Sequence, residues 1–184
     1  MTPIQELRDE HDGILHMLDI VRAICRKMAL RKTIQGEHLD RVMTFLRIFI
    51  DRCHHGKEEK IFFPELKHHP VPSLPDLFDE LVKEHGVGRK LMEDMGAALE
   101  RFYSGNQEAP DIFIEAAERY DALIRGHIQK ENTLLFPHAE KELDQNRQAA
   151  LMERFDQLEE EEIGSGRHDQ FHRQMEQLSR IYLD

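Results

Sequence analysis

The sequence contains one twelve-residue stretch twice, at residues 53–64 and again 73 residues later at residues 126–137. In each copy a histidine and a glutamate stand four residues apart and are followed by apolar residues and a proline. The pairs are His54 with Glu58 and His127 with Glu131. On an α-helix this spacing leaves two side chains about 40° apart around the axis and about 6 Å apart along it. Both side chains can therefore reach one ion, and the repeated stretch predicts metal binding between helices.

Three of the predicted helices carry a seam of residues spaced three or four positions apart, as in a helix face packed against a partner. The two spacings alternate strictly in the first and third helices. A histidine interrupts the seam of the first helix at His11 and that of the third helix, 74 residues later, at His85. Thr2 is a suitable N-cap for the first helix, with Pro3 at the first helical position. The seams consist of Ile4, Leu7, His11, Ile14, Leu18, Val21, Cys25 and Met28 in the first helix, Phe78, Leu81, His85, Gly88, Met92, Met95, Leu99 and Phe102 in the third, and Phe113, Ala116, Tyr120, Leu123, His127, Glu131 and Leu134 in the fourth.

The second helix is expected to run from about Glu37 to a kink or end near Pro64, because proline disrupts a helix interior. The three prolines within residues 68–75 indicate a loop, and the third helix follows from about Asp76. Residues 146–163 predict an amphipathic helix, and a break at residues 164–166 leads to a last short helix.

Each half of the repeat thus consists of a helix with one histidine followed by a helix with the His-Glu pair. Two helical hairpins related by a pseudo-twofold axis predict an all-α, antiparallel up-down-up-down four-helix bundle with one or two additional C-terminal helices. Residues 1–145 form the bundle in this prediction, and residues 146–184 form a helical extension packed on it. No segment has the pattern of a strand.

Composition limits the classes of partner. Lys and Arg number 25 against 36 Asp and Glu, and the net charge of −11 argues against binding to nucleic acid or to an anionic membrane. Cys25 and Cys53 form no CxxC pair, so we expect two buried thiols rather than a disulfide framework. Without a basic and apolar leader or an apolar run of about 18 residues, a cytoplasmic protein is expected.

The seam histidines and the repeated glutamates all point toward the interior of the predicted bundle. Two buried carboxylates without partners would cost several kcal/mol each, and metal ions remove that cost. Imidazole with carboxylate suits iron, manganese or zinc, and six residues in twofold arrangement suit two ions that share both glutamates as bridges. The predicted metal ligands are His11, His54, Glu58, His85, His127 and Glu131. Such a set leaves coordination positions open for a small ligand.

Other polar residues are expected to have lesser roles. His55, Glu59 and Tyr120 are candidates to complete the metal shell, although support or packing is the expected role of each. His16, His38, His68 and His69 are interpreted as surface residues, His168 and His172 as an exposed helix face, His138 as turned away by Pro137, and Lys57 and Lys130 as solvated or paired on the outer face. Ile14, Ile50, Ile61, Leu123 and Leu134 are expected to keep bulk water from the metals.

The ordered series of seam histidines and His-Glu pairs resembles the hemerythrin-like family, also called the HHE cation-binding domain, over residues 1 to about 145. The resemblance implies a non-heme di-iron pair bridged by Glu58, Glu131 and an oxo or hydroxo group, with zinc or manganese as substitutes. It also implies a small ligand such as O₂, NO or peroxide.

One position departs from the oxygen-carrying members of that family, which have a fifth histidine four residues after the one that matches His85. Arg89 stands there in this chain. With four histidines the two irons would be more alike, which favours NO, peroxide or sensing chemistry over reversible O₂ carriage. The alternatives that stay open are a di-iron peroxidase or oxidase, a protein that delivers iron or repairs iron centres, and a bundle in which the metal is structural.

Overall fold

The computed structural model describes residues 1–67, 75–164 and 166–183, and within these ranges the chain is helical and contains no strand. The predicted all-α class is therefore confirmed. The predicted loop at residues 68–75, with His68 and His69, lies almost wholly outside the described residues. The elements are α1 (Pro3–Ala29), α2 (Gly36–Thr44), η1 (Phe45–His54), α3 (His55–Lys57), η2 (Glu58–Phe62), α4 (Phe63–Lys67), α5 (Pro75–Tyr103), α6 (Ala109–Lys130), η3 (Glu131–Leu135), α7 (Phe136–Glu142), α8 (Gln145–Glu162) and α9 (Arg167–Tyr182), where η denotes a π-helical stretch.

Side-chain caps fix the start of two helices. Thr2 Oγ1 accepts a hydrogen bond from the Gln5 backbone N–H at 3.1 Å and Pro3 is the first residue of α1, as predicted. Asp144 caps α8 in the same way, through the backbone N–H of Arg147 at 2.9 Å. Each cap satisfies a backbone donor that has no partner inside the helix.

The helices that contain the repeated stretch do not end at its prolines. The segment from α2 to α4 continues past Pro64 to Lys67, and the segment from α6 to α7 continues past Pro137 to Glu142. Of the predicted kink or end near Pro64, the end is therefore wrong, and the helix changes its hydrogen-bond pattern there instead. In both copies a π-helical stretch ends just before the proline, which becomes the second residue of a new α-helical segment, where its missing N–H is tolerated.

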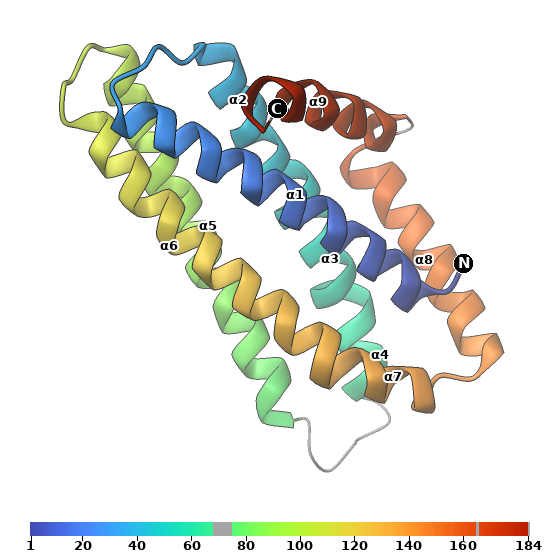
Figure 1. The fold of residues 1–184 in the computed structure, drawn as a ribbon. Helices are drawn as coiled ribbons and strands as arrows, with labels where there is room; N and C mark the ends of the chain where they lie inside the picture. The colour runs from blue at the N-terminus through green and yellow to red at the C-terminus, as the bar shows by residue number, and fades with distance from the viewer. Residues whose placement is uncertain (68–74, 165, 184) are drawn as a thin grey trace.

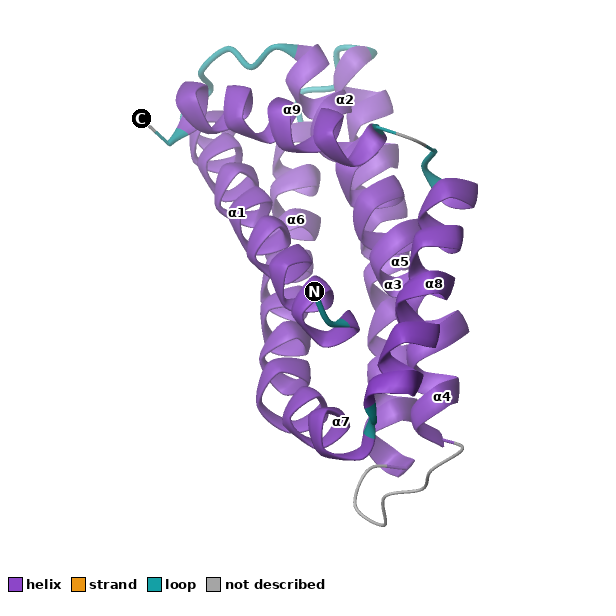
Figure 2. Ribbon diagram, turned by 90° about the vertical axis from the view of Figure 1, so that its right-hand side faces the viewer, coloured by secondary structure: helices purple, strands orange, loops and turns teal. Residues whose placement is uncertain are grey.

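Four helical segments lie side by side: α1, the segment α2 to α4, α5, and the segment α6 to α7 (Figure 1). Helix α6 packs against both α1 and α5. Helix α8 runs along α1 and the second segment, and α9 crosses α1 near η1 (Figures 1 and 2).

Buried apolar residues form two clusters, one on each side of a polar layer. In α1 the sequence passes from Leu7 in one cluster through His11 to Ile14 in the other. In α5 it passes likewise from Leu81 through His85 to Leu91. The polar layer therefore lies inside the protein with an apolar cluster above and below it.

Candidate metal centre

The six predicted site residues meet in this polar layer. His11 comes from α1, His85 from α5 and His127 from the end of α6, while the π-helical stretches supply the rest: His54 from η1, Glu58 from η2 and Glu131 from η3. Their relative exposed areas are 1% or less. Because π-helical stretches occur mostly at functional sites, their presence at three of these residues is consistent with a site rather than a repeated structural accident.

The four histidines form two pairs whose ring nitrogens face each other. His11 Nε2 lies 3.1 Å from His54 Nε2, and His85 Nε2 lies 3.0 Å from His127 Nε2. Each pair takes one histidine from a seam and one from a repeated stretch, so the pairing follows the internal repeat of the sequence.

Each carboxylate spans both histidine pairs. Glu58 Oε1 lies 3.5 Å from His54 Nε2 and its Oε2 lies 3.4 Å from His85 Nε2. Glu131 Oε2 lies 3.1 Å from His11 Nε2 and its Oε1 lies 3.3 Å from His127 Nε2. The two oxygens of one carboxylate thus face different histidine pairs, which is the arrangement that bridging two ions requires.

The other ring nitrogen of each of these histidines faces an oxygen. Nδ1 of His54 and of His127 lies 2.7 and 3.0 Å from a carboxylate oxygen of Glu10 and Glu84, respectively. His85 Nδ1 lies 2.7 Å from Glu59, and His11 Nδ1 lies 3.2 Å from the side-chain oxygen of Asn132. An oxygen at Nδ1 favours the ring proton there, so that each Nε2 can direct its lone pair at a metal in the centre of the site.

Without metal, the buried oxygens of the two central glutamates are energetically unfavourable. All four carboxylate oxygens of Glu58 and Glu131 are buried without a hydrogen-bond partner. Burial, reinforced by the facing Glu131, raises the pKa of Glu58 well above its ordinary value. Burial also opposes the ionisation of Glu131, but His127 and His11 lower its pKa well below the ordinary value.

Cations fit this arrangement. Metal–nitrogen bonds of about 2.1 Å place two ligands at right angles about 3 Å apart. The two facing nitrogen pairs have that separation, and the oxygens beside them are those that lack partners. Imidazole and carboxylate together suit iron, manganese or zinc.

Among the described residues there are three groups of potential ligand atoms, each with all its atoms within 4.8 Å of one another. The group of Glu10, Glu159 and His168 lies outside the centre, whereas the other two lie in the polar layer and share Glu58. One group is His11, His54, Glu58 and Glu131, and the other is His55, Glu58, His85 and His127. The sequence made His55 a candidate for the metal shell but predicted support or packing as its role. Glu59 and Tyr120, the other two candidates for the shell, belong to neither of these groups. Glu59 contacts Nδ1 of His85, the ring nitrogen that faces away from the centre, and the buried Tyr120 hydroxyl has no hydrogen-bond partner.

Glu10 and Glu84 directly precede the seam histidines His11 and His85, and the sequence pattern predicted no role for either glutamate. Each of them also accepts a hydrogen bond from a lysine: Lys57 Nζ lies 2.6 Å from Glu10, and Lys130 Nζ bonds Glu84. The sequence does contain a signal for these contacts, because both glutamates and both lysines repeat at matching positions.

Lys130 is paired and partly exposed, as expected. Lys57 is paired but has no exposed surface, so its expected place on the outer face is wrong.

The extra helix α8 explains the burial of Lys57. Glu159 of α8 lies 3.1 Å from Lys57 Nζ, and Glu6 of α1 lies 2.6 Å from it. Helix α8 packs on the first copy of the repeat and not in the same way on the second. The side chain of Leu134, in the second copy, is therefore 54% exposed. The prediction that Leu134 shields the metals is therefore wrong, and its neighbour Leu135 is buried instead; Ile14, Ile50 and Ile61 are buried as expected.

The remaining histidines differ from one another. His38 is buried and its Nδ1 lies 2.8 Å from the Tyr182 hydroxyl of α9, so its surface assignment is wrong. His172 is exposed as expected, whereas His168 is half-buried and packs on Phe49 with ring centroids 5.2 Å apart. The contacts of His38 with Tyr182 and of His168 with Phe49 both join α9 to the first half of the chain.

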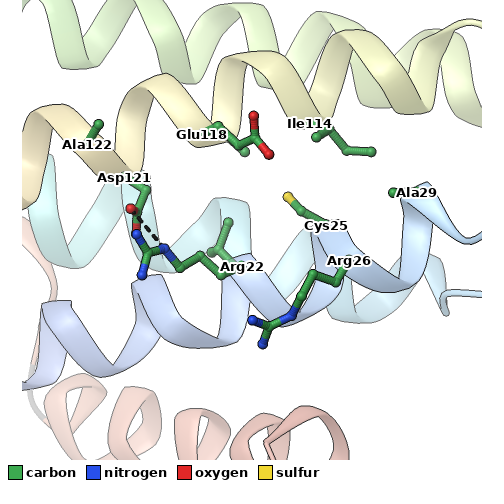
Figure 3. A pocket seen from close by; sticks show the side chains of 10 residues that line it. Arg22, Cys25, Arg26, Ala29, Ile114, Glu118, Asp121 and Ala122 are labelled. Atoms are coloured by element: carbon green, nitrogen blue, oxygen red, sulfur yellow. Dashed lines mark ion pairs between the residues drawn. The ribbon is translucent and has the colours of Figure 1, made fainter.

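The surface also contains a cavity of about 410 Å³ between α1 and α6. Cys25, Glu118 and the ion pair of Arg22 with Asp121 line it (Figure 3). Cys25 is fourteen residues from His11 on α1, or about 21 Å along the helix. This cavity is therefore separate from the polar layer.

Comparison with known proteins agrees with the geometry. The sequence model of the hemerythrin HHE cation binding domain matches residues 2–139. The chain belongs to this family, whose domain binds metal cations. Uncharacterized proteins from Mycobacterium bovis and from two strains of Mycobacterium tuberculosis are each 26% identical to it over 137 residues, which is 74% of this chain.

The chain spans about half the length of these curated relatives, 53% in each case. No solved structure matches the sequence significantly. Among the described helices, none has the length and apolar character needed to cross a membrane.

Proposed function

We propose that this protein is a non-heme di-iron protein that binds a small ligand, O₂, NO or peroxide, for sensing, storage or a stress response. In this proposal residues 1–145 are an up-down-up-down four-helix bundle of two pseudo-symmetric hairpins, and residues 146–184 are an extension packed on it. His11, His54, Glu58, His85, His127 and Glu131 hold two irons.

One observation carries the proposal: each of the two central carboxylates reaches one histidine of each pair. Oxygens of Glu58 lie 3.5 and 3.4 Å from His54 and His85, and oxygens of Glu131 lie 3.1 and 3.3 Å from His11 and His127. A single ion would need only one of the two histidine pairs. Two carboxylates that each span both pairs support two ions with shared bridges.

The protein contributes positioning and shielding. The oxygens at Nδ1 orient the four imidazoles and increase their basicity toward a metal. The apolar clusters on either side of the layer exclude bulk water from it. Iron held there supplies open coordination positions and a redox couple within reach of O₂, NO or peroxide.

Metal analysis of the chain purified from iron-replete cells tests the proposal. We expect about two irons per chain. Zinc alone, or one tightly bound ion, would refute a di-iron centre.

Exposure of the reduced iron-loaded protein to air, NO and peroxide in turn then separates the functions. A stable adduct with O₂ or NO supports ligand binding and sensing. Rapid consumption of peroxide with turnover supports a peroxidase instead. Loss of iron to a chelator during the exposure supports delivery or repair of iron centres.

A further inference from the structure

His55 is buried in the polar layer, and its contacts are not those expected of a residue that only fills space. It is 2% exposed, and its ring stacks on that of His85 with centroids 3.8 Å apart and planes at 15°. A ligand atom of His55 lies within 4.8 Å of those of Glu58, His85 and His127. Its Nδ1 is buried without a hydrogen-bond partner.

The internal repeat shows what this position holds when no third histidine is present. The residue 73 positions after His55 is Ile128, which is buried at 3% in the apolar core. Asp51, which lies 3.7 Å from His55 Nδ1, corresponds likewise to the buried Ile124. An aliphatic residue thus fills the equivalent space in the other half of the protein.

A buried imidazole with an unpartnered nitrogen is destabilising relative to a satisfied or an apolar residue. The isoleucine of the second half avoids that cost. A cation bound at the other ring nitrogen, Nε2, holds the ring proton on Nδ1, which faces the Asp51 carboxylate at 3.7 Å. Metal bound at the layer likewise removes the cost of the unpartnered Glu58 and Glu131 oxygens.

Arg89, which stands where the oxygen-carrying relatives have a fifth histidine, holds the surroundings of His55 in place. Its Nε donates to Asp51 at 2.7 Å and its Nη2 donates to Glu59 at 2.7 Å. Glu59 in turn lies 2.7 Å from His85 Nδ1. One guanidinium therefore fixes the carboxylate beside His55 and the carboxylate behind His85, the two stacked rings. Its counterpart in the first helix, 74 residues earlier, is Leu15.

We propose that His55 is a seventh metal ligand, for the ion held by Glu58, His85 and His127, and that Arg89 is its positioning residue through Asp51. This proposal rests on the proposed di-iron function. The two ion positions are then unlike, one with three imidazoles and the other with the two of His11 and His54. Under this proposal the two irons differ, in contrast to the two similar irons expected with four histidines.

The variant His55→Ile tests the ligand role, because it copies the residue of the other half. Binding of Fe(II) is titrated against a competing chelator, and ⁵⁷Fe-loaded, oxidised protein is examined by Mössbauer spectroscopy. The wild type should bind two irons with distinct quadrupole doublets. In His55→Ile we expect at least tenfold weaker binding at one ion, little change at the other, and a change in one doublet.

His38→Ile is the matched control, since His38 is a buried histidine that bonds Tyr182 and belongs to neither ligand group. It should leave both affinities and both doublets unchanged. Arg89→Leu, a copy of Leu15, should alter the same doublet as His55→Ile but by a smaller amount. It also serves if His55→Ile does not fold, which circular dichroism of the metal-free protein reports.

The outcomes separate the two proposals. A wild-type chain that binds fewer than two irons refutes the di-iron function itself. Two irons in the wild type, with affinities and doublets unchanged in both His55→Ile and Arg89→Leu, refute only the role of His55. Equal weakening of both ions in His55→Ile also refutes it, because that result indicates general loss of packing.

Discussion

The ammonium group of Lys57 lies 2.6 Å from the carboxylate of Glu10, and the Lys57 side chain has no exposed surface. Burial opposes its charge, but Glu10 and Glu6 raise the pKa of Lys57 above its ordinary value. Because Glu10 also accepts from His54 Nδ1, this lysine supports the metal layer from behind. A residue that looks like a surface charge in the sequence is therefore part of the core.

Replacing Lys57 should cost much more stability than replacing its counterpart. Lys57→Met leaves buried carboxylates without their cation, which costs about 3–5 kcal/mol. Lys130, at 26% exposure, can be replaced at a cost of about 1 kcal/mol or less. Urea denaturation of both metal-free variants measures the difference. Equal losses would show that the cover by α8 has no energetic effect.

Removing a central carboxylate should affect metal binding and stability in opposite directions. In Glu58→Ala we expect the iron content to fall below two per chain, because Glu58 belongs to both ligand groups. The metal-free variant should be no less stable than the wild type, because a buried carboxylate without a partner is removed. Glu65→Ala, which removes an ion pair with Arg147 outside the layer, is the control. Two irons retained in Glu58→Ala would refute the bridge.

In the metal-free protein, His54 and His127 should each reduce stability on opposite sides of pH 6.5. Burial lowers the pKa of His54 to about 4, so this side chain costs stability as the pH falls from 6.5 and the unfolded chain alone takes up a proton. Burial opposes the charge of His127, but Glu131 raises its pKa to about 9, so stability is also lost as the pH rises from 6.5. Each effect amounts to about 3 kcal/mol.

Urea midpoints measured between pH 5 and pH 9 in the presence of a chelator test this profile. With iron bound, the loss above pH 6.5 should disappear, because metal binding requires neutral imidazole and improves as protons leave. A flat profile without metal would contradict the assigned protonation of the two histidines.

Neither thiol should react in the native protein. Burial, together with Glu118 and Asp121, raises the pKa of Cys25 to about 12, so about one thiol in ten thousand is ionised at pH 8. Burial also raises the pKa of Cys53. A disulfide reagent at pH 8 should modify both thiols in urea and neither, over the same time, in the folded chain. Rapid native reaction would show that the α1–α6 cavity opens readily.

Local sequence patterns predicted the helices and singled out six residues that meet in one layer of the structure. Apolar spacing fixed which faces of α1 and α5 turn inward, and the doubled stretch placed His54 and Glu58 beside them. These features depend only on neighbours three or four residues apart, which a sequence shows directly. The predicted all-α class follows from the same periodicity.

Contacts between distant residues could not be predicted in this way. Glu159 reaches Lys57 across 102 residues, and Tyr182 reaches His38 across 144. The exposure of Leu134 has the same origin, since α8 covers only one of two similar halves. The π-helical stretches were also missed, because their i to i+5 hydrogen bonds leave no distinct apolar period over five or ten residues.

The polar layer between the two apolar clusters has a consequence for the lifetime of bound metal. A core divided in this way can open at one end while the other stays folded, as cooperative units do in native-state amide exchange. The smaller cluster, around Leu7, Phe136 and Phe155, closes the layer from one side. Ion escape then needs only a partial opening, so the residence time of the metal is set by the local stability of that end and is shorter than the lifetime of the fold.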